Sequence, residues 1–265
     1  MGNEELHSHS WYHTFELPDG VVTQGLFDLR SVAKKVPIPA SLDGKRCLDA
    51  AASDGFWSFE LARRGAKEVV SLDLDDTTRQ DIQGVDTSGN PRAGDQGRAA
   101  KAFHLVRDAL GADNVRRVDM NVYDASPERL GTFDYVFMGA ILLHLSDPAK
   151  AVRAIRSVTN PDGEFLSVET VSLPLTLLSR RRPLASLSTR DDFPRWWTPN
   201  MAGHRRLLQS GGFDVVDAGG PVFERFGSWR PRVPRSIPSG PEWHYWLWTR
   251  PFGLTSAWAR CRPTP

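Results

Sequence analysis

Two acids at the ends of short apolar segments are the first residues in this chain whose positions indicate chemistry. Asp49 and Asp73 lie within residues 46–76, RCLDAAASDGFWSFELARRGAKEVVSLDLDD. A turn of small residues follows Asp49, apolar residues recur at helical spacing from Phe56 to Ala62, and a second apolar segment ends at Asp73. In a βαβ unit, an acid about 20 residues after such a turn typically holds the ribose of a nucleoside cofactor. This region therefore predicts a cofactor site.

The chemistry of the turn distinguishes two classes of cofactor. A dinucleotide needs a G-x-G-x-x-G turn, whose backbone approaches the pyrophosphate at a helix N-terminus. The turn DAAASDG has one glycine, Gly55, and it carries Asp54 where a carboxylate repels a pyrophosphate. S-adenosylmethionine has no phosphate and carries a sulfonium and an ammonium group, so acids near the turn favour it. We expect Asp49 to hold its amino group and Asp73 its ribose hydroxyls, unless a longer strand places Asp75 or Asp76 there.

Alternating strand and helix patterns along the chain predict an α/β fold, with a doubly wound, mostly parallel sheet and helices on both faces. After residues 46–76 we expect strands over 115–122, 133–138, 164–171 and 214–220, a Trp-rich final strand over 242–249, and helices over 103–110, 149–159 and 201–213. Residues 11–30 read as a hairpin around Pro18, and the polar, glycine-rich residues 77–100 read as a functional or disordered loop. Ligands of such sheets bind at the carboxyl ends of the strands.

The composition excludes several classes of protein. A formal charge of +1 over 265 residues indicates no general affinity for nucleic acid or membrane. Two cysteines are too few for a disulfide framework. No apolar run approaches the roughly 18 residues of a membrane span, and residues 1–10 lack the apolar core of a signal peptide. We expect a cytoplasmic protein with no membrane partner and no metal.

Several segments of the chain resemble class I S-adenosylmethionine-dependent methyltransferases. The D-x-G-x-G-x-G turn of that family corresponds to Asp49, Ala51, Ser53 and Gly55, so alanine and serine replace two glycines. More narrowly, WYHTFELPDG, GLFDLR, SDGFW, MGAILLHLSDPAKAV and WWTPN are similar to the group related to the wobble-uridine carboxymethyl transferases of tRNA. The resemblance covers residues 11–216. It implies S-adenosylmethionine as cofactor and a seven-stranded Rossmann-like methyltransferase sheet with an antiparallel last strand.

The resemblance divides the chain into a hairpin or lid over residues 1–44 and a cofactor-binding domain over residues 45–265. It also assigns candidate contacts to particular residues. On the cofactor side these are the turn residues Ser53, Asp54 and Gly55, then Asn121 and Val122 beside the adenine, and Gly139 near the methionine part. On the acceptor side they are Trp11, Tyr12, Trp196, Trp197 and Asn200.

Three residues are candidates for proton transfer to or from an acceptor. His144 follows the fourth predicted strand, where it acts as a general base or packs in the core. His13 belongs to the predicted lid. Glu169 ends the fifth predicted strand, where a buried carboxylate can have the raised pKa that suits a base.

We expect transfer of a methyl group to a small molecule, as in specialised metabolism, and no tRNA partner. The tRNA enzymes carry a sizeable N-terminal region ahead of the cofactor domain, whereas about 45 residues precede the first predicted strand here. A neutral chain is also poorly suited to binding RNA. Three alternatives remain open: (carboxy)methyl transfer to a tRNA wobble uridine, an internal cyclisation of the cofactor's aminobutyrate arm, and a non-catalytic cofactor-binding domain.

Overall fold

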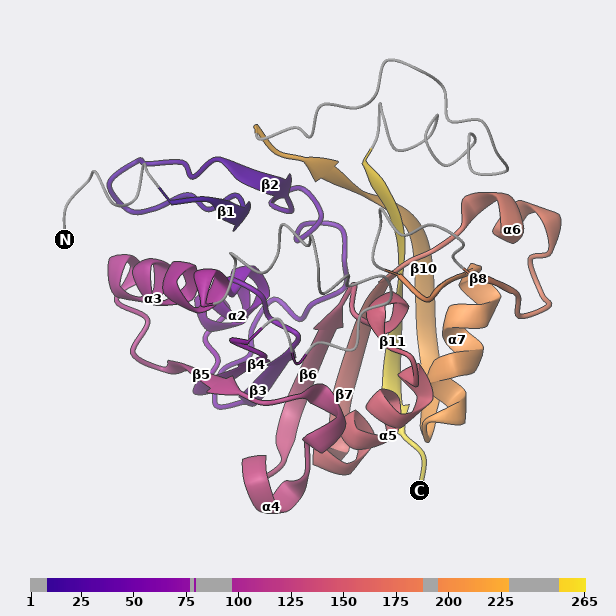
Figure 1. Cartoon of the computed structure of the whole chain (residues 1–265). Coiled ribbons are helices and arrows are strands. Elements are labelled where there is room, and N and C mark those ends of the chain that lie inside the picture. Colours follow the sequence, from indigo (N-terminus) through magenta and orange to yellow (C-terminus); the bar gives the residue numbers. More distant parts are fainter. Residues whose placement is uncertain (1–8, 77–78, 80–96, 188–194, 229–252) are drawn as a thin grey trace.

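The computed structural model describes residues 9–76, 79, 97–187, 195–228 and 253–265. Within these residues, nine strands form one sheet in the order β1-β2-β10-β11-β7-β6-β3-β4-β5, and helices cover both of its faces (Figure 1). Its strands are β1 (Trp11–His13), β2 (Gly25–Asp28), β3 (Arg46–Ala50), β4 (Glu68–Asp73), β5 (Val115–Asp119), β6 (Phe133–Gly139), β7 (Thr159–Thr170), β10 (Phe213–Phe226) and β11 (Leu254–Pro263). The short strands β8 (Ala185–Leu187) and β9 (Trp197–Pro199) pair separately.

The helices of the described residues connect these strands. They are α2 (Phe56–Arg63), α3 (Arg98–Leu110), α4 (Pro127–Leu130), α5 (Pro148–Val158), α6 (Leu173–Leu178) and α7 (Met201–Ser210), with 3-10 helices η3 (Val122–Asp124) and η4 (Leu142–His144). The helix expected from residue 103 begins earlier, because Gly97 adopts the left-handed φ of 72° that allows the chain to turn into α3. No helix of the described part is long and apolar enough to cross a membrane.

The predicted doubly wound α/β fold is confirmed, and the sheet is larger than expected. Strands β5, β4, β3, β6 and β7 are mutually parallel, as helical crossovers require. Strand β11 runs antiparallel to both β7 and β10, so the last described strand has the predicted direction. The additional strands β1 and β2 extend the edge beyond β10. The Trp-rich segment 242–249 lies outside the described residues, and the last described strand begins at Leu254.

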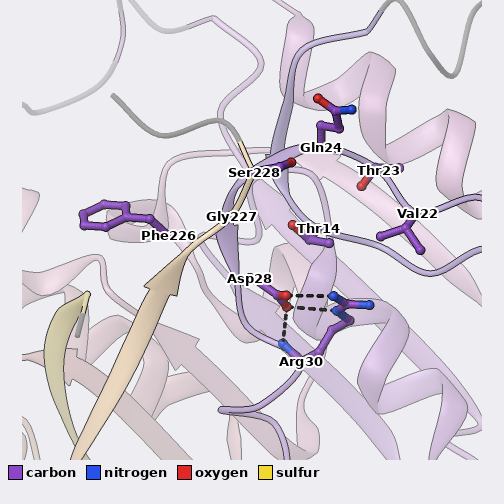
Figure 2. Close-up of a pocket in the computed structure, with 9 residues that line it drawn as sticks. All are labelled: Thr14, Val22, Thr23, Gln24, Asp28, Arg30, Phe226, Gly227 and Ser228. Atoms are coloured by element: carbon purple, nitrogen blue, oxygen red, sulfur yellow. Dashed lines mark hydrogen bonds and ion pairs between the residues drawn. The ribbon is translucent and has the colours of Figure 1, made fainter. Parts of the chain in front are cut away.

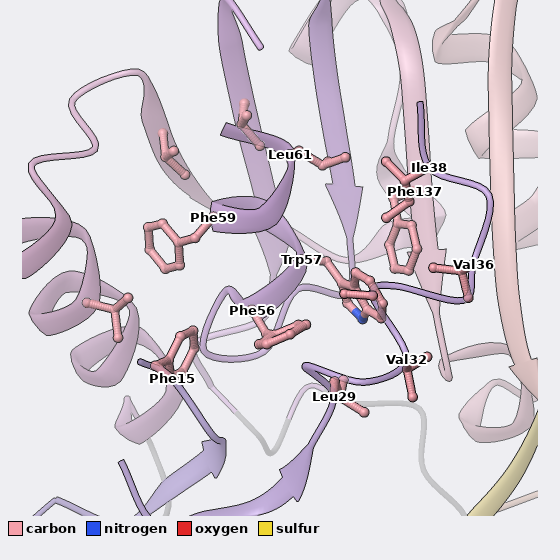
Figure 3. Packing of buried hydrophobic residues seen from close by; sticks show 14 of the residues in the cluster. Phe15, Leu29, Val32, Val36, Ile38, Phe56, Trp57, Phe59, Leu61 and Phe137 are labelled. Carbon is pink, nitrogen blue, oxygen red and sulfur yellow. The ribbon is translucent and has the colours of Figure 1, made fainter. Parts of the chain in front are cut away.

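Side chains of the central strands alternate between two apolar cores, one on each face of the sheet. Cys47 and Val69 face the core formed with α2, α3 and the N-terminal segment, where Trp57 packs on Phe137 with ring centroids 4.4 Å apart (Figure 3). Leu48 and Val70 face the core that includes residues of α5 and α7. Because both faces are covered, these strands read as continuous apolar runs in the sequence.

The N-terminal segment, residues 11–30, differs from the simple hairpin predicted for it. Its tip forms as expected, with an antiparallel bridge between Glu16 and Val22. Strands β1 and β2, however, pair in parallel. The side chain of Phe15 packs against Phe56 and Phe59 of α2, and its N–H donates to the Thr23 hydroxyl at 2.8 Å. These contacts hold the segment against the cofactor half of the sheet.

Candidate functional site

The turn between β3 and α2 adopts the backbone conformation that glycines usually supply. Ala51 and Ser53 have φ values of 64° and 52°, and Gly55 has a φ of 90°. A left-handed conformation costs a residue with a Cβ roughly 1–2 kcal/mol. At Gly55 a Cβ would also lie 2.6 Å from the Phe103 ring, so the glycine allows close packing of the turn against α3. Ala51 and Ser53 therefore adopt the glycine-like conformation of the turn, and this strains the backbone at both residues.

Asp49 lies at the carboxyl end of β3 and is 1% exposed. Its Oδ2 atom accepts a hydrogen bond from the Ser58 hydroxyl at 2.7 Å. Burial raises the pKa of this carboxyl to about 7, and the negative charge of Asp73 acts in the same direction. A bound cation would favour the ionised form of such a carboxyl.

Asp73 ends β4 beside the same turn. Its Oδ2 accepts from the Ser53 N–H at 2.5 Å, and its Oδ1 accepts from the Leu74 N–H at 2.7 Å. Burial raises the pKa of this carboxyl, and the nearby Arg117 guanidinium opposes the increase. A carboxylate has about four acceptor positions, so these two bonds leave capacity for two further donors such as ribose hydroxyls.

Asp54 connects the turn to the N-terminal segment. Its Oδ2 accepts from the backbone N–H groups of Tyr12 at 3.0 Å and His13 at 2.8 Å, and its Oδ1 lies 2.5 Å from Nδ1 of His13. Both side chains are buried, at 1% and 9% exposure. The sequence prediction assigned Asp54 to the cofactor, whereas the structure places its carboxylate on His13, 41 residues away in the sequence.

His13 lies among carboxyl groups from different strands. A positive charge at His13 would oppose the burial that raises the pKa of Asp49 on β3 and of Glu224 on β10, so the ring lies near both carboxyl groups. Donation from Nδ1 to Asp54 would orient the ring and leave Nε2 as the atom able to take a proton. The structure thus brings one of the three predicted bases, His13, to the cofactor turn.

Glu169 binds the loop after β6, and His144 lies further along the same loop. The Glu169 side chain is buried, its Oε2 accepts from the Leu142 N–H at 2.7 Å, and its Oε1 accepts from the Thr170 N–H at 2.8 Å. Burial raises the pKa of this carboxyl to about 8. Both oxygens therefore bind backbone groups, one of them at the start of η4, the 3-10 helix that ends at His144.

The predicted acceptor residues of the WWTPN segment are anchored to that same loop. The Trp196 N–H donates to Leu143 O at 2.7 Å, and Trp197 Nε1 donates to Leu145 O at 3.0 Å. Asn200 is fully buried and caps α7 by accepting from the Gly203 N–H at 2.7 Å. The segment and the loop after β6 thus lie together at the carboxyl ends of the strands.

The remaining predicted contacts lie at the edge of the site. Asn121 caps η3, since its Oδ1 accepts from the Tyr123 N–H at 3.0 Å, and Val122 is buried. Gly139 ends β6, where a Cβ would lie 3.0 Å from the Phe137 ring. Trp11 is buried and Tyr12 is 41% exposed. Their rings pack edge-on against Phe15 and Phe27 respectively, within the N-terminal segment and β2.

Sequence reasoning missed two charged residues of this region. Glu224 on β10 is buried and accepts from the Ser256 hydroxyl of β11 at 2.6 Å, and burial raises its pKa. Only the strand register, which pairs β10 with β11, brings these residues together. Arg117, in contrast, had a signal in the sequence, because it is an arginine inside a predicted buried strand.

No group of three or more potential metal ligands occurs in the described ranges.

A polar hollow of about 500 Å³ lies between the N-terminal segment and the end of β10 (Figure 2). Its lining includes Thr14, Gln24 and Phe226, and also Asp28 and Arg30, whose side chains pair through two hydrogen bonds of 2.9 and 2.7 Å. None of the residues predicted to bind cofactor or acceptor lines it.

Comparison with known proteins identifies methyltransferases. Residues 28–216 match the model of a family described as a methyltransferase domain. A ubiquinone biosynthesis O-methyltransferase of Neisseria meningitidis serogroup C is 29% identical over 192 residues, which is 69% of this chain and 70% of that protein. A tRNA U34 carboxymethyltransferase of Campylobacter hominis is 26% identical over 126 residues, which is 46% of this chain and 35% of that protein.

Solved structures show the same fold. The Burkholderia thailandensis 1,6-didemethyltoxoflavin-N1-methyltransferase, which was solved with S-adenosylhomocysteine, aligns with a TM-score of 0.51 and 17% identity over 89% of this chain and 78% of its own. The mitomycin 7-O-methyltransferase aligns with a TM-score of 0.51 and 11% identity over 88% of this chain and 52% of its own.

Proposed function

The chain belongs to the methyltransferase domain family and is a class I S-adenosylmethionine-dependent methyltransferase; from this premise we propose that it methylates a hydroxyl group of a small organic molecule. In this proposal His13, supported by Asp54, takes the proton of the acceptor hydroxyl. The observation that carries the proposal is the buried contact of 2.5 Å between His13 Nδ1 and Asp54 at the cofactor turn.

The described residues fit S-adenosylmethionine. The turn of Ala51, Ser53 and Gly55 presents backbone in the conformation that allows close approach of a ligand. Asp73 offers acceptors for the ribose hydroxyls, and Asp49 offers a buried carboxyl for the ammonium group. We assign Asn121 and Val122 to the adenine side and Gly139 to the methionine side, on the basis of their places at the carboxyl ends of the strands.

The cofactor supplies an electrophilic methyl carbon attached to a sulfonium, so the protein has mainly to align the acceptor and exclude water. A neutral hydroxyl is a poor nucleophile, and a positioned base removes this difficulty. With the cofactor bound, the acceptor oxygen would take the methyl group from the sulfonium, and Nε2 of His13 would accept the proton that the hydroxyl loses. Asp54 then stabilises the resulting imidazolium, as the acid of a His–Asp pair does.

A small acceptor fits the position of the N-terminal segment better than RNA does. Backbone groups of Tyr12 and His13 bind Asp54 directly, and this supports our proposal that residues 1–44 act as a lid on the domain that begins at residue 45. The walls of the acceptor site would be formed by Trp11, Tyr12, Trp196 and Trp197. Asn200 and Glu169 would position the segments that contact the acceptor, because their polar atoms bind backbone groups.

The similar proteins support a hydroxyl acceptor more than an RNA base. The match to an O-methyltransferase spans 70% of that relative, whereas the match to the tRNA carboxymethyltransferase spans 35% of its length. Action on a tRNA wobble uridine is the second candidate, and that partial match is the observation in its favour. A formal charge of +1 argues against it.

The test is formation of S-adenosylhomocysteine from S-adenosylmethionine in the presence of a panel of phenols and catechols, of unmodified tRNA, or of no acceptor. We expect turnover only with a hydroxyl acceptor, and a loss of about 100-fold or more in kcat for His13→Asn. The exposed His104 on α3 gives the matched control, His104→Asn, which should retain full activity. Turnover with tRNA alone, or without any acceptor, would contradict the proposal.

A further inference from the structure

Arg117 is a buried cation beside the cofactor turn, and neither the family match nor the predicted site gives it a role. It lies on β5 with a side chain that is 3% exposed. Its Nη1 donates to the carbonyl oxygen of Ser53 at 2.6 Å, and its Nε donates to Asp75 at 2.8 Å. Its guanidinium carbon lies 5.7 Å from the centre of the Phe103 ring. These contacts fix the orientation of the guanidinium against the strained turn.

Among the described residues, one nitrogen of this fixed group has no partner. Arg117 Nη2 is buried and has no hydrogen-bond acceptor in the part of the chain that the structure describes. Guanidinium N–H groups are obligate donors, and leaving one buried and unpaired costs free energy. A bound ligand that brings an oxygen to this place would remove that cost.

The neighbours of Arg117 indicate which ligand oxygen this is. The Ser53 carbonyl accepts a hydrogen bond from Arg117, and the Ser53 N–H donates one to Asp73. The guanidinium and the carboxylate therefore both bind this one residue of the turn. The Arg117 charge also opposes the burial that raises the pKa of Asp73, in line with their shared contact to Ser53. Asp73 is the acid expected to accept hydrogen bonds from the cofactor ribose.

We propose that Arg117 is a specificity residue of the cofactor site, and that its Nη2 donates a hydrogen bond to a ribose hydroxyl oxygen of S-adenosylmethionine. A ribose hydroxyl is both donor and acceptor. It can give its proton to Asp73 while its oxygen accepts from Arg117, so the two residues together recognise a hydroxyl and reject a hydrogen in its place.

The competing explanation is an ordered water in the interior. Ser71 is the register partner of Arg117 on β4, and its hydroxyl is also buried and has no partner among the described residues. A water that joins Ser71 and Arg117 would complete both groups without any contact to the cofactor. The two explanations differ in how Arg117 responds to the removal of a single ribose hydroxyl.

The experiment measures Kd by calorimetry for adenosine, 2′-deoxyadenosine and 3′-deoxyadenosine, with S-adenosylhomocysteine as the reference ligand. Wild-type protein and the variants R117M and R117K are compared. R116M is the matched control, because Arg116 is the adjacent arginine of β5, is half exposed, and pairs with Glu68 away from the turn. The test does not depend on the acceptor, so it is independent of the proposed hydroxyl chemistry.

In the wild type and in R116M, one of the two deoxynucleosides should bind about tenfold or more weakly than adenosine, the loss typical of a hydrogen bond to a charged group. In R117M that ratio should fall to about threefold or less, the remainder being the bond to Asp73. In R117K, which keeps the positive charge but lacks the planar guanidinium with its several N–H donors, the ratio should be intermediate.

If R117M weakens all three nucleosides by one common factor and leaves their ratios unchanged, Arg117 acts only on the turn and the proposal is wrong. Equal binding of the three nucleosides by the wild type would also overturn it. Since loss of the bond to Ser53 can unfold the turn, R117K is measured in parallel, and a wild-type ratio in R117K would count against the proposal in the same way.

Discussion

The carboxylate of Asp54 lies 2.5 Å from Nδ1 of His13, so the turn that precedes α2 is joined directly to the N-terminal strand. The same carboxylate accepts two backbone N–H groups of that strand. One buried acid thus holds both the predicted base and the backbone of the N-terminal strand.

Replacing this acid should destabilise the protein as well as inactivate it. Asp54→Ala removes the acceptor of three donors, two of them in buried contacts, and we expect a loss of about 3–5 kcal/mol in the free energy of unfolding. Urea unfolding at neutral pH measures the change, and Asp108→Ala, at an exposed acid of α3, is the control. A loss no larger than that of the control would show that the contact contributes nothing to stability.

Restoring a glycine in the turn should stabilise the protein. Ala51 has a φ of 64°, so Ala51→Gly relieves left-handed strain that exceeds the added entropy of the unfolded chain. We expect a gain of about 0.5–1 kcal/mol in the free energy of unfolding. In contrast, Ala62→Gly, inside α2, should lose about 1 kcal/mol. Destabilisation by both substitutions would mean that the turn is not strained at Ala51.

Cofactor affinity should depend on the ionisation of Asp49. The pKa of this carboxyl is about 7 in the cofactor-free protein, and a bound ammonium group favours the ionised form. The affinity for S-adenosylhomocysteine should therefore be constant above pH 7 and fall as the pH drops below it, by up to about tenfold per unit. Calorimetry between pH 5 and pH 8 tests this expectation. Asp49→Asn should bind more weakly and show a flatter profile, whereas an unchanged profile would assign the titration to another group.

Protein stability should fall as the pH rises, in part through Glu169. Its folded-state pKa is about 8, above the ordinary value of 4.5, so the folded state binds the extra proton between these values. The stabilisation is fully present below the lower value and is lost as the pH rises through the upper one, by at most about 1.4 kcal/mol per unit. Unfolding curves of wild type and Glu169→Gln from pH 5 to pH 8.5 measure the slope. The variant should keep a smaller slope, due to the other carboxyls with a raised pKa, Asp49, Asp73 and Glu224, and Glu128→Gln should match the wild type. Equal slopes in all three proteins would contradict the assignment.

The sequence predicted the parts of the fold whose signals are local. The βαβ unit, the parallel central strands and the places of Asp49 and Asp73 at the ends of β3 and β4 follow from apolar periodicity and from turns whose residues are close in the chain. The positions of Ala51 and Ser53 in the turn were also predicted, because the family pattern marks them. The number of strands in the sheet was not, since the hairpin predicted over residues 11–30 carries no local sign that β2 pairs with the distant β10.

Contacts between distant segments had no such signal. The Asp54–His13 pair joins residues 41 apart, and the Glu224–Ser256 pair joins residues 32 apart. Glu169 was predicted as a carboxylate facing the acceptor, but its two oxygens bind backbone N–H groups, one of them in η4. Such roles depend on tertiary packing, which brings a carboxylate to whichever donors lie free beside it.

The central claim, that His13 takes a proton from a hydroxyl acceptor, is tested most directly by varying the acidity of the acceptor. The measurement is kcat for wild type and His13→Asn at pH 8, with one accepted phenol that is neutral at this pH and a nitro-substituted analogue that is already ionised. We expect His13→Asn to lose about 100-fold or more with the neutral phenol and about threefold or less with the ionised one, because the ionised acceptor needs no base. An equal loss with both acceptors would show that His13 only positions the acceptor, and the proposed proton transfer would be wrong.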